Sequence, residues 1–354
     1  MLKRIKLIFL SRYWESKKNI KLFNDVYFKF SEKIKRFVYS LIFAEQPKFL
    51  YEVQKSFGKK NKDKKFFVIR LSIGGGVFSN YVNALYMIYY ARLNNLEPII
   101  DYENYPSYQR EKQKINNTKN SWEYFFEQPT KFELSEVYQS KNVLLSANNS
   151  MLYFNQLELK HFYDKEVLKE TNQLKILNEV SNLINYNSIT KKSIERNLKP
   201  LFSKKEKVLG IAVRGTDYNI KNFGINHHKP FTVVEALNKA QSLLSIESSF
   251  TKLFICTEEQ YIIDRFKQEY GDRLIYIERP RHTKESYDIT KNVMSQSSSR
   301  TNNRYFSSLE YITEVEGLLR CDHVIGTFTN AMYYITIKNT QLNKKIEVFD
   351  YGKN

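Results

Sequence analysis

Residues 66–102 read FFVIRLSIGGGVFSNYVNALYMIYYARLNNLEPIIDY. The segment over residues 66–72 is a continuous apolar run with the length and composition of a buried strand. A glycine turn follows, then a segment with helical spacing of apolar residues, and residues 97–102 form a second apolar run. A strand, a turn, a helix and a second strand make the βαβ unit of a parallel sheet. This stretch therefore predicts an α/β fold.

The second half of the 354-residue chain shows the same alternation. Its apolar runs alternate with helical patterns and cover residues 208–214, 252–258, 274–278, 323–328 and 346–351. A further short strand is expected at residues 142–146, and residues 153–201 have a mostly helical pattern. Pro200 and the lysine-rich segment after it indicate a domain boundary. We therefore expect a helical extension over residues 1–60 and two α/β domains, over residues 61–200 and 201–354, with a ligand cleft between them.

Composition narrows the function. The formal net charge is +18, but the lysines are spread along the chain without a recognised nucleic-acid motif, so we expect no nucleic-acid partner. The two cysteines, Cys256 and Cys321, lie inside apolar runs, which indicates reduced, packed thiols rather than a disulfide framework or a zinc site. These features favour a cytoplasmic protein.

The N-terminal residues alternate basic and apolar side chains, most clearly over residues 21–43. This pattern predicts amphipathic helices, which either pack on their own domain or lie on an anionic membrane surface. The apolar run at residues 7–10 is too short for a signal-peptide core or a membrane span. Peripheral attachment at the cytoplasmic face of the inner membrane is therefore one interpretation of this segment.

Polar residues follow three of the predicted strands in the second half. In open α/β sheets, ligands bind beyond the carboxyl ends of the strands, so these positions are candidate site residues. Arg214 and Asp217 follow the first strand; an arginine there can grip a diphosphate with parallel hydrogen bonds. The other two groups are Thr257, Glu258 and Glu259 after the second strand, and Thr327, Thr329 and Asn330 before a helix. Together they suggest a nucleotide-diphosphate site.

Each group also has a structural interpretation. Arg214 and Asp217 can form an ion pair, and Thr257 and Thr329 can cap the helices that follow them. Glu258 and Glu259 can complement the dipole of a helix N-terminus.

Three motifs resemble those of the α-1,6-fucosyltransferase, nodulation-fucosyltransferase and protein O-fucosyltransferase superfamily. They are GIAVRGTDY at residues 210–218, LFICTEEQYIIDRFKQEYGDRLIY at residues 253–276 and EYITEVEGLLRCDHVIGTFTN at residues 310–330. The glycine turn and helix at residues 74–93 are similar to the N-terminal turn of the same superfamily, and residues 120–129 to a segment of bacterial members from capsule and O-antigen clusters.

The resemblance implies a GT-B glycosyltransferase, with two Rossmann-like domains facing a cleft. The N-terminal domain would help to bind the acceptor and the C-terminal domain a nucleotide-sugar. The implied reaction is an inverting, metal-independent transfer of fucose from GDP-fucose to a glycan or lipid-linked glycan acceptor in surface polysaccharide synthesis, without a cofactor. By this resemblance, Arg214 matches the family arginine that contacts the donor diphosphate. Glu314 occupies the position where family members have an aspartate that contacts the nucleotide. The residues after the second and third strands match donor-binding positions of the family.

The chain departs from the family pattern at three positions. Ala212 replaces a histidine two residues before the arginine, Gly215 replaces a second arginine, and Asn222 stands where core-fucosylating enzymes have a proposed base. A proton acceptor must then come from elsewhere, unless the departing phosphate takes the proton. His227 and His228 are the nearest histidines in the sequence. One of them can act as the base, or both can be solvated loop residues.

On the acceptor side, we expect Asn80 and Asn83 to face the cleft as acceptor or sugar ligands. Gly74, Gly75 and Gly76 either let the backbone approach a bound group or form a turn with positive φ. Three alternatives to the fucosyltransferase interpretation remain: the same fold with another nucleotide-sugar, a nucleic-acid-binding protein, and an inactive structural homologue.

Overall fold

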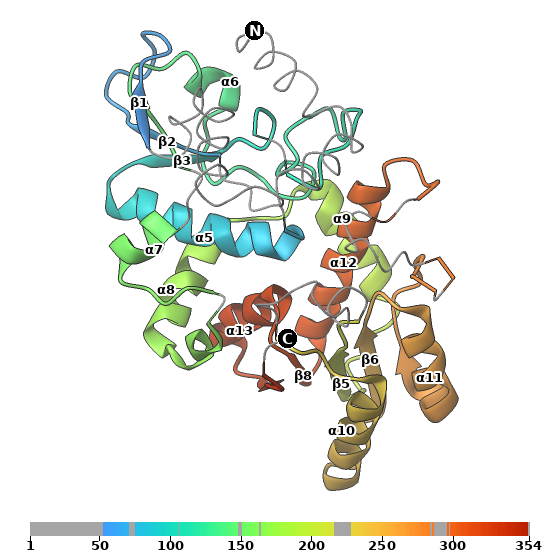
Figure 1. Cartoon of the computed structure of the whole chain (residues 1–354). Helices are drawn as coiled ribbons and strands as arrows, with labels where there is room; N and C mark the ends of the chain where they lie inside the picture. Colours follow the sequence, from blue (N-terminus) through green and yellow to red (C-terminus); the bar gives the residue numbers. More distant parts are fainter. Residues whose placement is uncertain are drawn as a thin grey trace, which may run out of the picture.

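The computed structural model describes residues 52–70, 75–105, 107–147, 151–162, 164–215, 228–283, 285–286, 296 and 298–352. Two sheets lie at opposite ends of the molecule, with helices between them (Figure 1). The expected α/β architecture with parallel sheets is confirmed. Most of the expected helical extension over residues 1–60 lies outside the described residues.

The first sheet has four strands in the order β1-β4-β2-β3. Their bounds are Val53–Lys55 for β1, Phe66–Ile69 for β2, Glu97–Ile100 for β3 and Val143–Leu145 for β4. β2 is parallel to both β3 and β4, whereas β1 is antiparallel to β4. Every residue of β2 is buried, as expected for a central parallel strand covered on both faces. β1 is a correction to the expected helical extension, because the end of that segment joins this sheet as a strand.

The second sheet has five parallel strands in the order β7-β6-β5-β8-β9. Their bounds are Val208–Ala212 for β5, Lys252–Cys256 for β6, Leu274–Ile275 for β7, His323–Thr327 for β8 and Lys345–Phe349 for β9. All five strands lie within or next to the predicted apolar runs. The chain adds strands on one side of β5 and then crosses to the other side at β8. This reversal is the topological switch point at which doubly wound sheets bind their ligands.

Helices cover both faces of the second sheet. α10 (Val233–Ile246) and α11 (Gln260–Tyr270) pack on one face, and α12 (Asn303–Arg320) lies across β5 and β6 on the other. α10 begins with a capping box, in which the Thr232 hydroxyl accepts from the Glu235 amide and the Glu235 carboxylate accepts from the Thr232 amide. α13 (Asn330–Leu342) follows β8 directly.

The remaining helices belong to the first half of the chain. Their bounds are Val77–Leu93 for α5, Leu134–Val137 for α6, Met151–Leu157 for α7, Thr171–Ser181 for α8 and Ser188–Leu198 for α9, with a 3-10 turn, η1, at Lys165–Lys169 and another, η3, at Gly271–Arg273 in the second half. α5 is buried on almost all sides, which is the pattern of a helix in the centre of a core.

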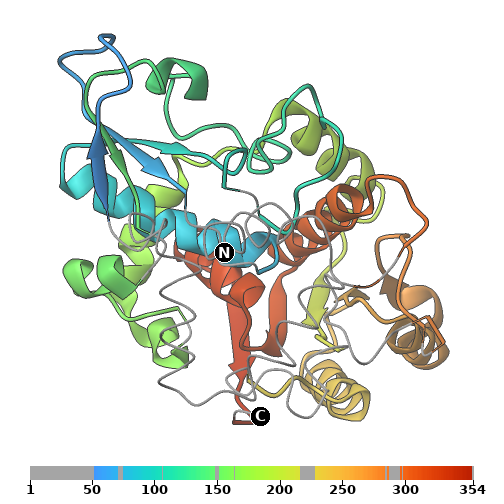
Figure 2. The same ribbon diagram turned by 45° about the horizontal axis from the view of Figure 1, so that its top comes forward.

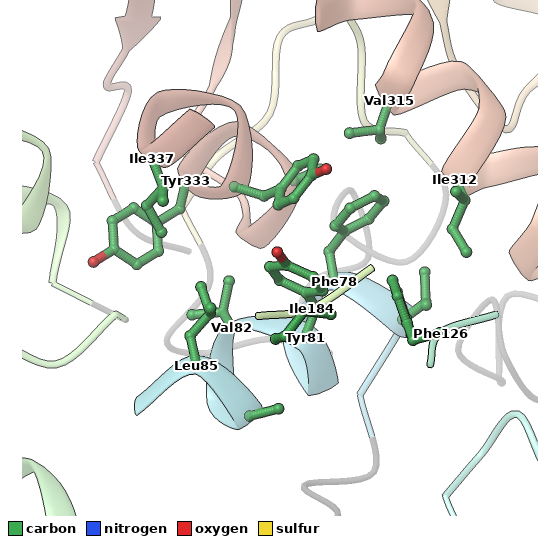
Figure 3. Packing of buried hydrophobic residues seen from close by; sticks show 14 of the residues in the cluster. Phe78, Tyr81, Val82, Leu85, Phe126, Ile184, Ile312, Val315, Tyr333 and Ile337 are labelled. Atoms are coloured by element: carbon green, nitrogen blue, oxygen red, sulfur yellow. The ribbon is translucent and has the colours of Figure 1, made fainter. Parts of the chain in front are cut away.

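α5 connects the two halves of the molecule. It packs against β2 and β3 of the first sheet and against α13 of the second half, and α8 contacts both α5 and α13. Figure 2 shows α5 lying between the first sheet and the helices that cover the second sheet. Phe78, Tyr81 and Leu85 of α5 point toward α12 and α13 (Figure 3). One apolar cluster therefore runs continuously from the first sheet to the second.

No helix among the described residues has both the length and the apolar character needed to cross a bilayer.

Two leucines of α5 test how strongly this packing stabilises the fold. Leu85 is fully buried beneath α13, whereas Leu93 at the end of the helix is 57% exposed. We expect Leu85→Ala to lower the free energy of unfolding by about 2–5 kcal/mol because it leaves a cavity. Leu93→Ala should change the same quantity by less than about 0.5 kcal/mol. Urea denaturation followed by circular dichroism measures both; equal effects would contradict the burial of Leu85.

Candidate functional site

The three predicted strand ends meet at one pocket. Because β6, β5 and β8 are parallel neighbours, their carboxyl ends lie at the same edge of the sheet. The pocket, together with its mouth open to solvent, has an empty volume of about 380 Å³. It is lined by Ala212, Val213, Arg214, Cys256, Thr257, Glu258, Tyr311, Leu318, Thr327, Thr329 and Ala331. The pocket lies at the topological switch point between β5 and β8.

Arg214 provides the positive charge of the pocket. It lies two residues after β5, and its Nη1 forms an ion pair with Oε1 of Glu258, which follows β6. The two side chains are 18% and 11% exposed, so they are mostly shielded from solvent. Oε2 of Glu258 is buried and has no hydrogen-bond partner among the described residues. A guanidinium held in this way can bind an anionic group that enters the pocket.

The third strand end places a helix N-terminus in the pocket. Thr327 is the last residue of β8 and Thr329 is the N-cap of α13, whose hydroxyl accepts from the Met332 amide at 3.2 Å. The predicted capping role of Thr329 is therefore confirmed. Asn330 is the first residue of α13. The first amide groups of a helix lack intrahelical partners and favour anions, so this end complements Arg214.

The second strand end is packed more tightly. The Thr257 hydroxyl accepts from the Glu259 amide at 3.3 Å, and Thr257 is almost fully buried. The Glu259 carboxylate lies against Gly215, so a larger residue at position 215 would require this carboxylate to move. Among the residues of this strand end, Thr257 and Glu258 line the pocket, whereas Glu259 supports the backbone after Arg214.

Glu314 lies beneath the pocket instead of lining it. It is fully buried in α12, and its carboxylate accepts two hydrogen bonds from Arg279, at 2.9 and 2.8 Å, and one from Arg281 at 2.9 Å. Both carboxylate oxygens are already bound by guanidinium groups, so Glu314 connects α12 to the segment that carries Arg279 and Arg281. Its expected contact with a nucleotide has no support in this geometry.

The two arginines fix the end of β6. Arg279 and Arg281 both donate to the Thr257 carbonyl, at 3.0 and 3.2 Å. The backbone of His282 continues the attachment, since its amide donates to the Glu258 carbonyl at 2.8 Å. Burial lowers the pKa of Arg281, while the Glu314 carboxylate acts in the opposite direction. This network positions the backbone that carries Glu258, the partner of Arg214.

The other walls of the pocket are apolar. Tyr311 of α12 lies edge-on to Phe78 of α5, with ring centroids 5.5 Å apart, so the first half of the chain supports the pocket from behind. Burial raises the pKa of the Cys256 thiol well above its usual range. The thiol therefore stays protonated at neutral pH and serves as an apolar wall rather than as a nucleophile.

Asn80 and Asn83 do not line the pocket of Arg214. Asn80 donates to Gln109 Oε1 at 2.9 Å and lies in a second, smaller hollow beside the loop that follows β3. Asn83 is fully buried, and both of its side-chain polar atoms have no hydrogen-bond partner among the described residues. Gly76 is the N-cap of α5 with open space around its α-carbon, and the Gly75 carbonyl accepts from Gln109 at 3.3 Å. Neither residue therefore faces the pocket of Arg214, and only Asn80 borders a hollow; a role on the acceptor or sugar side stays a prediction.

The predicted catalytic residues after Arg214 are only partly within the described structure. Asp217, Asn222 and His227 lie outside the described residues, as does Gly74. His228 is buried, and its Nδ1 lies 3.3 Å from Oδ1 of Asp350, just after β9. Among the described residues, no group of three or more His, Cys, Asp or Glu side chains could hold a metal ion.

Sequence reasoning did not select three charged residues near the site: Arg279, Arg281 and Asp350. All three follow strands of the second sheet, so the rule that selected Arg214 also applies to them. The two arginines in the segment ERPRH, at residues 278–282 after β7, are the sequence feature that could have marked them as candidate site residues. Their pairing with Glu314, more than thirty residues away in the sequence, could not be inferred from either segment alone.

No protein-family model matches the chain, and no curated protein matches it. Among solved structures, it is similar to NodZ α-1,6-fucosyltransferase soaked with GDP-fucose, with a TM-score of 0.43 and 13% identity over 77% of this chain and 92% of that chain. It is also similar to fucosyltransferase NodZ from Bradyrhizobium, with a TM-score of 0.42 and 12% identity over 78% and 92% of the two chains.

A third similar structure is POFUT1 in complex with GDP-fucose, with a TM-score of 0.42 and 10% identity over 82% of this chain and 99% of that chain.

The Glu314 network gives a prediction about stability. Glu314→Gln leaves Arg279 and Arg281 buried without a carboxylate, so we expect the free energy of unfolding to fall by about 3–5 kcal/mol. Glu310→Gln, one turn earlier in α12, breaks the more exposed pair with Arg300 and should cost less than about 1 kcal/mol. Chemical denaturation of both variants measures the difference. A small loss in Glu314→Gln would show that the network does not stabilise the fold.

Proposed function

We propose that the protein is a glycosyltransferase that moves a sugar from a nucleotide-diphosphate donor to a glycan hydroxyl. One observation supports this most directly: Arg214 and the N-terminus of α13 line the same pocket at the switch point of a parallel sheet. A guanidinium and a helix N-terminus both bind phosphate oxygens. Both also stabilise negative charge that develops on a departing diphosphate.

The proposed roles of the residues follow from their positions. Arg214 binds the diphosphate, and Glu258 holds the arginine until a donor arrives. The buried Oε2 of Glu258 is then able to accept a hydrogen bond from a hydroxyl of the donor. Thr327, Thr329 and Asn330 bring the first turn of α13 to the phosphates. We propose that Asp217, after the same strand as Arg214, contributes to this site as well.

GDP-fucose is the proposed donor and fucose the transferred sugar, because the three motifs resemble those of GDP-fucose-dependent enzymes. The family resemblance also underlies our proposals that the reaction inverts the anomeric configuration, needs no metal ion and serves surface polysaccharide synthesis. The proposed location at the cytoplasmic face of the inner membrane rests on the alternating basic and apolar residues of the N-terminal sequence. The solved NodZ and POFUT1 structures include complexes with GDP-fucose or GDP.

A second candidate function is the same transfer from a different nucleotide-sugar. Ala212 lines the pocket at a position where the resembled family has a histidine. The alanine methyl group cannot hydrogen-bond to a base, so this position does not select guanine. A binding screen with GDP-, UDP-, TDP- and CMP-sugars separates the two candidates: binding of GDP-fucose alone favours the first, and tighter binding of another sugar nucleotide favours the second.

Arg214→Ala tests the donor site. We expect about 10- to 100-fold weaker binding of GDP-fucose, because the variant loses charge-assisted hydrogen bonds to the diphosphate. Arg265→Ala removes an exposed arginine from α11 and should leave the affinity unchanged. Isothermal titration calorimetry measures both variants. Wild-type affinity in Arg214→Ala would refute the proposed role of the arginine, and absence of binding to any sugar nucleotide in the wild type would refute the function.

A further inference from the structure

A histidine and a carboxylate are paired at the same sheet edge as the pocket. Asp350 follows β9, the strand next to β8, and its Oδ1 lies 3.3 Å from Nδ1 of His228. The same oxygen accepts from the Gly352 amide at 3.0 Å, and Oδ2 forms an ion pair with Lys165 from the first half of the chain. Asp350 is therefore fixed from both of its oxygens.

The pair lies beside the pocket. The His228 ring packs edge-on against Phe328, with ring centroids 4.9 Å apart, and Phe328 stands between the pocket-lining residues Thr327 and Thr329. In the β8–β9 register Thr327 is opposite Phe349, so Asp350 comes one residue beyond the last pair. Phe328 thus connects the His228 imidazole to the end of β8, where we place the diphosphate.

The contacts of Asp350 determine which imidazole nitrogen can accept a proton. Lys165 is the main cause that lowers the pKa of Asp350 to about 2, so this carboxylate is ionised at neutral pH. An ionised carboxylate can only accept hydrogen bonds, and it favours the imidazole tautomer that carries its proton on Nδ1. Nε2 then has a lone pair. Nε2 is buried and has no hydrogen-bond partner among the described residues.

We infer that His228 is the proton acceptor of the transfer reaction and that Asp350 is the residue that positions it. This inference rests on the proposed glycosyltransferase function. In the step, the acceptor hydroxyl oxygen forms a bond to the anomeric carbon of the donor sugar, and its proton passes to Nε2 of His228. The bond from the anomeric carbon to the diphosphate oxygen breaks, and the nucleoside diphosphate leaves with the electron pair beside Arg214.

A second histidine–carboxylate pair on the same two strands provides a matched control. Nε2 of His323, the first residue of β8, lies 3.1 Å from Oε1 of Glu347 in β9. His323 is at the amino end of its strand, opposite the edge that carries the pocket. Both pairs connect an imidazole to a carboxylate, but only the His228 pair lies at the carboxyl edge. A structural requirement for such pairs would affect both; a catalytic requirement would affect one.

Steady-state transfer from GDP-fucose to a hydroxyl acceptor tests the inference with Asp350→Asn, His228→Asn and Glu347→Gln. We expect kcat to fall about 10²-fold or more in the first two variants, with the dissociation constant of GDP-fucose within about twofold of wild type. Glu347→Gln should keep wild-type kcat. Wild-type kcat in either of the first two variants, or an equal loss in all three, would overturn the dyad while leaving the donor site intact.

Nitrogen-15 NMR of histidine-labelled protein provides a readout that does not need a donor. At about pH 8.5, where a free imidazole is neutral, His228 should show a protonated Nδ1 and an unprotonated Nε2. Asp350→Asn should shift these resonances toward the tautomer mixture of a free imidazole, whereas Glu347→Gln should not. A wild-type His228 with its proton on Nε2 would overturn the inference whether or not the protein binds GDP-fucose.

Discussion

The packing of α5 against α13 is the contact on which the arrangement of the molecule depends. α5 is covered by β2 and β3 on one side and by α8 and α13 on the other, so its position fixes how the two sheets face each other. Within this apolar layer, the Tyr86 and Tyr333 hydroxyls lie 2.9 Å apart and Gln173 donates to both of them. Buried polar groups must find partners, so this cluster specifies the register in which the helices meet.

A second polar cluster acts in the same layer. The hydroxyl groups of Tyr186 and Tyr334 both donate to Glu316, at 2.8 and 2.6 Å. Burial raises the pKa of Glu316, while the two tyrosine hydrogen bonds act in the opposite direction. Tyr186 belongs to the first half of the chain and Tyr334 to α13, so the cluster connects the two halves. Phe78 packs against Tyr334 of this cluster and against Tyr311, which lines the pocket, so it connects the cluster to the pocket wall.

The sequence predicts the sheets well because their signal is local. A strand such as FFVI is apolar throughout because both of its faces are buried. Four consecutive apolar residues are therefore enough to indicate such a strand. The positions of Arg214, Thr257 and Thr329 were also predictable, because parallel strands place their carboxyl ends at one edge. The partners were not predictable. Whether Glu314 contacts a nucleotide or two arginines depends on a segment that is distant in the sequence. The burial of Asn83 depends on helices that follow it in the chain by about ninety residues or more.

The most direct test of this account is a crystal structure of the protein with GDP. We expect the diphosphate to contact the Arg214 guanidinium and the first amide groups of α13, with the Arg214–Glu258 ion pair rearranged around it. A diphosphate bound away from the carboxyl edge of β5, β6 and β8, for example in the hollow beside Asn80, would contradict the central claim.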